Sequence, residues 1–158
     1  MSNINHQNLG REGTHIHLLF RILALNGDPG PNHHHESEQA MSTYEHCNPT
    51  MLLEVVGNDK EVFLELVDIF LSDSLEKLKE MEAAVQAQDA GKLEYTSHSL
   101  KGTVSPLGAE ALTQMLQDIE TESCKFQRLC SSERLAQVSD ELHLTRQEVM
   151  RFVADGNY

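Results

Sequence analysis

Residues 98–108 read HSLKGTVSPLG, and this stretch is the most informative part of the chain. On a helix with about 3.6 residues per turn, His98, Lys101, Gly102 and Ser105 lie at positions i, i+3, i+4 and i+7, so they share one face. The apolar side chains in and just before this stretch point another way: Leu93, Leu100, Val104 and Leu107. This pattern predicts an imidazole on the solvent side of the helix, with a cation one turn away and no side chain at position 102 to crowd it.

Breaking and capping residues set the ends of this helix. Asp89 can accept hydrogen bonds from the backbone of the first turn and is a suitable N-cap. Pro106 has no N–H, so it leaves the carbonyl of Gly102 without its helical partner and should bend or end the helix. Gly108 is a natural stop, because glycine readily adopts the left-handed conformation that terminates helices.

A longer amphipathic helix is expected before this one. Asn58 is a good N-cap, and Glu61 three residues later completes an arrangement similar to a capping box. The apolar residues that follow recur at intervals of three and four: Phe63, Leu66, Val67, Phe70, Leu71, Leu75, Leu78, Met81 and Val85. We expect the helix to be loosened near residues 72–74, where two serines interrupt the pattern.

Two more helices follow the motif. The first carries Leu112, Met115, Leu116 and Ile119, and the second carries Leu135, Val138, Leu142, Thr145, Val149 and Phe152. Between them, Ser131 and Ser132 are suitable cap residues. Four amphipathic helices joined by short loops predict an all-α fold, an antiparallel up-down four-helix bundle with one shared core.

Residues 1–48 differ in composition from the rest of the chain. Residues 26–32 are rich in Gly, Pro, Asn and Asp, and three consecutive histidines follow. We predict an N-terminal extension and linker over residues 1–48, poorly ordered or with one short additional helix over residues 15–25, and the bundle over residues 49–158. Met41 is an alternative start. The apolar run over residues 16–25 is too short to cross a bilayer, and no small-residue cleavage site follows it.

Composition restricts the class of protein further. The chain has 158 residues, which suits one domain with a real core. Its formal net charge of −13 argues against a nucleic-acid surface, because few cations are present to neutralise phosphates. The three cysteines lack metal-ligand spacing and are typical of reduced thiols. We therefore expect a cytoplasmic monomer that binds neither nucleic acid nor membrane.

The residues around His98 suit phosphoryl chemistry. An imidazole can attack phosphorus and hold the phosphoryl group as a reactive phosphoramidate. Lys101 can stabilise the phosphoryl oxygens, Gly102 leaves room for a partner to approach, and Ser105 can add a hydrogen bond at the edge of the site. Glu120 lies near the end of the next helix, where an antiparallel neighbour can bring it beside His98. A carboxylate there fixes the tautomer and leaves the other ring nitrogen as the nucleophile.

HSLKGTVSPLG resembles the signature of histidine-containing phosphotransfer (HPt) domains, His-x-x-Lys-Gly with a further Gly ten residues after the His. The resemblance extends over residues 50–154 and includes Val56-Gly57-Asn58 and Phe70-Leu71. It implies that His98 accepts a phosphoryl group from a receiver aspartate or a kinase and passes it to another receiver. The family usually carries Gln or Glu at the distance of Glu120. Pro106 departs from the pattern, since small or polar residues are commoner there.

These observations together predict an intermediate of a multistep phosphorelay. Its expected partners are response-regulator receiver domains and a hybrid sensor histidine kinase. The chain has no Gly-rich nucleotide loop, so we expect no ATP site, no cofactor and no metal of its own, with Mg²⁺ supplied by the receiver. Two alternatives are a helical adaptor that binds these partners without catalysis, and a metal-binding protein that uses residues 33–35, His46 and Cys47.

Overall fold

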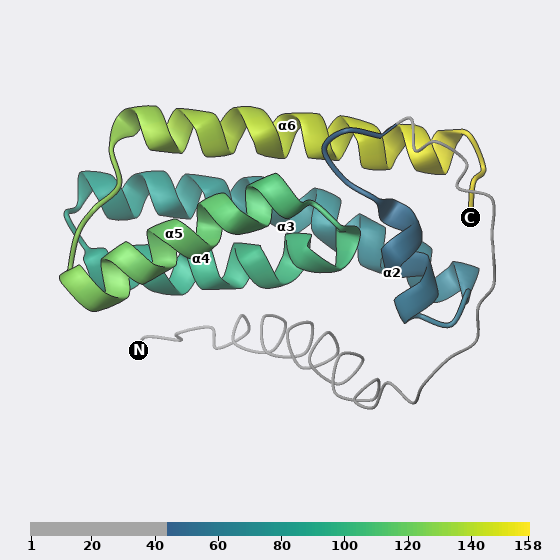
Figure 1. The fold of residues 1–158 in the computed structure, drawn as a ribbon, viewed down its shortest axis with the longest axis horizontal. Helices are drawn as coiled ribbons and strands as arrows, with labels where there is room; N and C mark the ends of the chain where they lie inside the picture. Colours follow the sequence, from purple (N-terminus) through teal and green to yellow (C-terminus); the bar gives the residue numbers. More distant parts are fainter. Residues whose placement is uncertain (1–43) are drawn as a thin grey trace, which may run out of the picture. The chain divides into compact units, whose positions relative to one another are not determined.

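The computed structural model describes residues 44–158, and within this range the chain forms five α-helices and one short 3-10 helix (Figure 1). In chain order the elements are α2 (Pro49–Val55), α3 (Lys60–Gln86), α4 (Ala90–Val104), η1 (Ser105–Leu107), α5 (Glu110–Phe126) and α6 (Ser132–Ala154). The four long helices α3 to α6 confirm the predicted antiparallel bundle. The additional helix expected over residues 15–25 lies outside the described residues. No helix of the described range is both long and apolar enough to cross a membrane.

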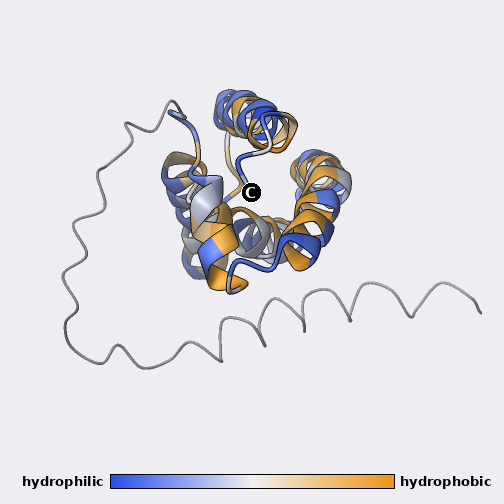
Figure 2. Cartoon of the chain, turned by 90° about the vertical axis from the view of Figure 1, so that its right-hand side faces the viewer, coloured by the Kyte–Doolittle hydropathy of each residue, from blue (hydrophilic) through white to orange (hydrophobic). Residues whose placement is uncertain are grey.

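The predicted apolar stripes form the core of the bundle. Figure 2 looks along the helices and shows hydrophobic segments turned toward one another. All six apolar or small positions predicted on the last helix are buried on α6, as are most of those predicted on α3. Leu75 is an exception because 43% of it is exposed, while its neighbour Ser74 is fully buried. Arg146 of α6 accounts for the burial of Ser74, because its Nη1 donates to Ser74 Oγ at 2.7 Å. This hydrogen bond satisfies the serine hydroxyl between α3 and α6.

The start of α3 differs from the sequence prediction by one residue. Gly57 and Asn58 both have a positive φ, 70° and 61°, so the chain is still turning at the residue predicted to be the cap. The N-cap is Asp59, whose Oδ1 accepts from the N–H groups of Glu61 and Val62 at 3.0 and 3.2 Å. The predicted loosening of this helix over residues 72–74 is also wrong, because α3 is continuous from Lys60 to Gln86.

The end of α4 follows the prediction. Asp89 caps its start by accepting from the N–H of Lys92 at 2.8 Å. The helix ends at Val104, Pro106 lies in η1, and Gly108 adopts a left-handed conformation with φ 66°. This turn brings the start of α2 close to Gly108, and the N–H of Asn48 donates to the carbonyl of Leu107 at 2.8 Å. The breaker residues therefore shape a contact between η1 and α2 as well as a helix end.

Residues 44–48, here called the strap, lie along α6. Glu148 of α6 accepts the backbone N–H groups of residues 45, 46 and 47 at 2.8, 2.8 and 3.1 Å. Burial alone would raise the pKa of Glu148, but these hydrogen bonds outweigh it and hold the pKa below its ordinary value. His46 Nδ1 lies 2.9 Å from Glu141 Oε1. Two carboxylates of α6 thus fasten a segment that the composition assigned to the extension.

The His46–Glu141 contact is expected to make stability depend on pH. The hydrogen bond with Glu141 raises the pKa of His46 above 6.5 more strongly than burial lowers it. A group with a raised folded-state pKa stabilises the fold below its unfolded pKa and loses this contribution as pH rises through the folded pKa. The melting temperature of Glu141→Gln should therefore fall furthest below that of the wild type at about pH 5.5 and approach it by about pH 8.5.

The matched control for this experiment is His143→Gln, which changes an exposed histidine of the same helix. Its melting temperature should follow that of the wild type across the range. A Glu141→Gln deficit that stays constant with pH would show that His46 does not carry the effect.

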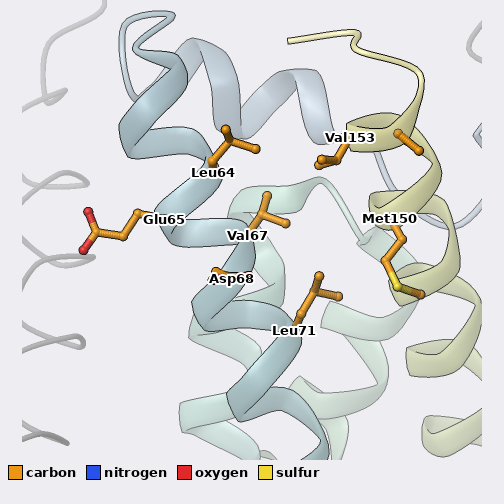
Figure 3. A pocket seen from close by; sticks show the side chains of 8 residues that line it. Leu64, Glu65, Val67, Asp68, Leu71, Met150 and Val153 are labelled. Atoms are coloured by element: carbon orange, nitrogen blue, oxygen red, sulfur yellow. The ribbon is translucent and has the colours of Figure 1, made fainter.

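A shallow groove of about 590 Å³ lies between α3 and α6 (Figure 3). Its lining is mostly apolar and includes Leu64, Val67, Leu71, Met150 and Val153. The helix that carries His98 does not line this groove. The predicted site on α4 therefore lies outside this groove.

Candidate functional site

The site is built on the antiparallel pair α4 and α5. The side-chain contacts that cross between them include His98 with Glu120, Lys101 with Gln117, and Ser105 with Thr113. Each step of three or four residues forward along α4 is matched by an equal step back along α5. This constant register places the face that carries the motif directly opposite one face of α5.

His98 is exposed and held by one ring nitrogen. Its side chain is 56% exposed, and its Nδ1 lies 2.9 Å from Glu120 Oε1. Burial of Glu120 would raise the pKa of that carboxyl, but hydrogen bonds from Lys101 and His98 outweigh it and keep the pKa below its ordinary value. Glu120 is therefore an ionised acceptor at neutral pH, and Nδ1 of His98 carries the hydrogen. In this tautomer the ring lone pair lies on Nε2, where it can act as a nucleophile.

Lys101 lies beside the same carboxylate. Its Nζ donates to Glu120 Oε2 at 2.5 Å and to Gln117 Oε1 at 2.7 Å. Glu120 thus bridges the two motif residues, with one oxygen for each. The Lys101 side chain is only 19% exposed, so its position is well defined by these contacts. The structure brings His98, Lys101 and Glu120 together as the sequence predicted.

Gln117 was not predicted from the sequence as part of the site. This residue lies three positions before Glu120 on α5, so the two share a face of the helix. Once Glu120 was placed opposite His98, the same helical spacing places Gln117 opposite Lys101. The spacing of three residues between Gln117 and Glu120 was present in the sequence, but a glutamine has no ionisable or nucleophilic group that marks it as a site residue.

The remaining two motif residues are placed differently. Gly102 is exposed, and a Cβ built at this position would meet no atom within 4 Å. The fold of the described chain therefore does not require a glycine here. Ser105 is exposed at the C-terminal end of α4, and its hydroxyl lies 3.5 Å from that of Thr113. Its role at the edge of the site remains a prediction.

The residues of the alternative metal site have other contacts. In the described part of the chain, no group of three or more His, Cys, Asp or Glu is arranged to hold a metal ion. His46 lies against Glu141, as described above. Burial, with the nearby Glu148, raises the pKa of the Cys47 thiol to about 12, which keeps it protonated and a poor ligand. The histidines at residues 33–35 lie outside the described range.

Comparison with known proteins identifies the family of the chain. The sequence model of the Hpt domain matches residues 65–149. The phosphorelay protein LuxU of Vibrio vulnificus is 30% identical over 105 residues, which are 66% of this chain and 90% of LuxU. The phosphorelay intermediate protein rdeA of Dictyostelium discoideum is 30% identical over 121 residues, 73% of this chain and 46% of rdeA.

A solved structure is also similar. The histidine-containing phosphotransfer protein B (HptB) of Pseudomonas aeruginosa PAO1 superposes with a TM-score of 0.59 at 29% identity, and the match covers 67% of this chain and 96% of HptB. The helical bundle and the match to the Hpt domain model thus define a phosphotransfer protein. The chain belongs to the Hpt domain family. It is a histidine phosphotransfer intermediate of a phosphorelay, and Hpt proteins relay phosphoryl groups between kinase and receiver domains.

Proposed function

We propose that His98 is the residue that carries the phosphoryl group, between the aspartates of receiver domains. The observation that carries this proposal is the state of the ring: Nδ1 is bound to Glu120, and Nε2 is left as the nucleophile on an exposed helix face. In the forward step, the Nε2 lone pair attacks the phosphorus of a receiver aspartyl phosphate. The N–P bond forms, the P–O bond breaks and the aspartate carboxylate leaves. In the return step, an aspartate carboxylate of the next receiver attacks the phosphorus. A new O–P bond forms, the N–P bond breaks and His98 is released.

The neighbours of His98 take supporting roles in this proposal. Glu120 holds the Nδ1 hydrogen, which orients the ring and favours the positive charge that develops on it during transfer. Lys101 supplies a positive charge one turn away that can face the phosphoryl oxygens. Gly102 has no side chain, and the space that this leaves beside His98 allows a receiver to bring its aspartate to Nε2. Ser105 can add a hydrogen bond at the edge of the site.

The partners follow from the openness of the site. We propose that receiver domains of response regulators and a hybrid sensor histidine kinase dock on the exposed face of α4 and α5, in the cytoplasm and on a monomer of this chain. The chain itself supplies no cofactor, and catalytic Mg²⁺ resides on the receiver. In support, Mg²⁺ requires several free oxygen ligands. The carboxylate that contacts His98, Glu120, already accepts from both Lys101 and His98.

The experiment that tests this function is phosphoryl transfer from a panel of phosphorylated receiver domains. Label that appears on the chain and is labile in acid but stable in base is expected, because phosphoramidates hydrolyse in acid and acyl phosphates in base. Absence of label from every receiver, with the protein folded, would overturn the carrier role in favour of the helical adaptor.

Gly102→Ala should separate folding from transfer. Because the added methyl group meets nothing within 4 Å, the protein should gain about 0.5–1 kcal/mol of stability from the better helix propensity of alanine. The rate of transfer from a receiver should fall, since the methyl group occupies the approach to His98. Thermal unfolding and single-turnover transfer measure the two effects.

Gly91→Ala is the matched control, because Gly91 lies on the same helix and its added Cβ would make only an ordinary contact, 3.6 Å from Asp89. It should transfer at the wild-type rate. Wild-type transfer by Gly102→Ala itself would remove the steric role assigned to Gly102.

A further inference from the structure

We propose that Gln117 is a positioning residue for phosphoryl transfer, which holds Lys101 through a neutral hydrogen bond so that the ammonium can turn from Glu120 to the incoming phosphoryl group. This inference rests on the proposed role of His98 and extends it to a residue outside the motif. Gln117 does not act on phosphorus in this scheme. It acts through Lys101, whose ammonium it contacts at 2.7 Å.

The first support is the register of the two helices. Gln117 is the residue of α5 directly opposite Lys101, whereas Glu120 is opposite His98. The contact between Lys101 and Glu120 is therefore diagonal. Lys101 shares Glu120 with His98, but it does not share Gln117 with the histidine.

The second support is the difference in charge between the two acceptors. An ammonium bound only to a carboxylate has much of its positive charge offset by that partner, which weakens its attraction for a phosphoryl group. The amide oxygen of Gln117 can continue to accept a hydrogen bond from the Lys101 ammonium while the ammonium turns from Glu120 to the phosphoryl group. Because the amide is neutral, it adds no negative charge beside the phosphoryl oxygens. An ammonium has three N–H donors, so it can keep one on Gln117 while another turns outward.

The orientation of the Gln117 amide is itself fixed. Its Nε2 donates to the hydroxyl of Thr121 at 3.2 Å, one turn further along α5. This contact turns the amide oxygen toward Lys101, where an acceptor is needed, and keeps the NH₂ group away from the ammonium. Gln117 is thus arranged as an acceptor for Lys101.

Gln117→Met tests the proposal, because methionine has similar length and helix propensity but lacks the acceptor oxygen. In single-turnover transfer at saturating phosphorylated receiver, we expect the rate to fall by about tenfold, the loss of one hydrogen bond to a charged group. Receiver affinity and the melting curve should not change. Gln114→Met is the matched control: Gln114 lies on the same helix, is exposed and contacts Asp118, so transfer should continue at the wild-type rate.

A double-mutant cycle with Lys101→Met separates positioning from a general structural effect. In the Lys101→Met background, Gln117→Met should change the rate by less than about twofold, because the residue through which it acts is absent. Gln117→Glu should also slow transfer, since it retains an acceptor but adds a negative charge near the phosphoryl group.

The outcomes distinguish this inference from the function on which it rests. Wild-type rates for Gln117→Met, or an equal loss with and without Lys101, would overturn the role of Gln117 and leave His98 in place. Wild-type rates for Gln117→Glu would overturn the argument from neutrality. A wild-type protein that accepts no phosphoryl group from any receiver would instead overturn the proposed function.

Discussion

Replacing His98 with Gln is expected to abolish phosphoryl uptake and to leave unfolding nearly unchanged. An amide has no basic ring nitrogen, so no N–P bond can form at this position. The side chain is 56% exposed, and the glutamine NH₂ group can still donate to Glu120. Substitutions at such surface positions usually change stability by no more than about 0.5 kcal/mol. The loss of uptake would therefore be a chemical effect, independent of folding.

Transfer of label from a phosphorylated receiver, together with a melting curve, measures both parts of this prediction. His143→Gln makes the same change at an exposed histidine of α6 and should take up label at the wild-type rate. Uptake by His98→Gln at a normal rate would show that another residue carries the phosphoryl group.

Gly108→Ala is expected to have the largest effect on stability, a loss of about 2–3 kcal/mol. Gly108 has φ 66°, a conformation in which a Cβ is strained. A Cβ there would also lie 2.7 Å from Met51 Sδ, 3.0 Å from Asn48 Cβ and 3.2 Å from Asn48 N. The Met51 side chain can move, but Asn48 is held by its backbone hydrogen bond to Leu107, so α2 would have to shift.

Denaturant unfolding measures this loss, with Gly102→Ala as a comparison of opposite sign on the adjoining helix. Adding Met51→Ala should recover only the part of the loss due to the sulfur contact. A loss below about 1 kcal/mol would show that strain and crowding at Gly108 are relieved easily.

Much of the fold could be predicted from helical periodicity, because the core side chains of α4, α5 and α6 recur at the spacing of one buried face. Pro106 and Gly108 marked a helix end for local reasons that apply in any context. Contacts distant in sequence were harder to predict. Ser74 is buried because Arg146 reaches it, and no pattern within α3 contains that information. Asn58 and Asp59 are both good caps, and the left-handed turn at Gly57 decided between them.

The candidate site was predictable to the extent that it depends on spacing. His98 and Lys101 share a face of one helix, and an antiparallel neighbour brings Glu120 to them. Gln117 required the register of α4 and α5, which the structure supplies. The strap was not predictable, because nothing in the sequence distinguishes Glu148 from other surface glutamates. Its role is evident only from the three backbone N–H groups that donate to it.

The sequence separations of these contacts bear on the order in which the chain folds. The contacts that His98 and Lys101 make with α5 join residues 16 to 22 positions apart, within a single helical hairpin. The backbone hydrogen bonds of the strap to Glu148 join residues 101 to 103 positions apart. Closing a long loop is entropically less favourable than closing a short one, and non-local contacts form late in folding. We therefore expect the hairpin that carries His98 to assemble early, and the first described residues to join α6 only after the bundle to which they attach has formed.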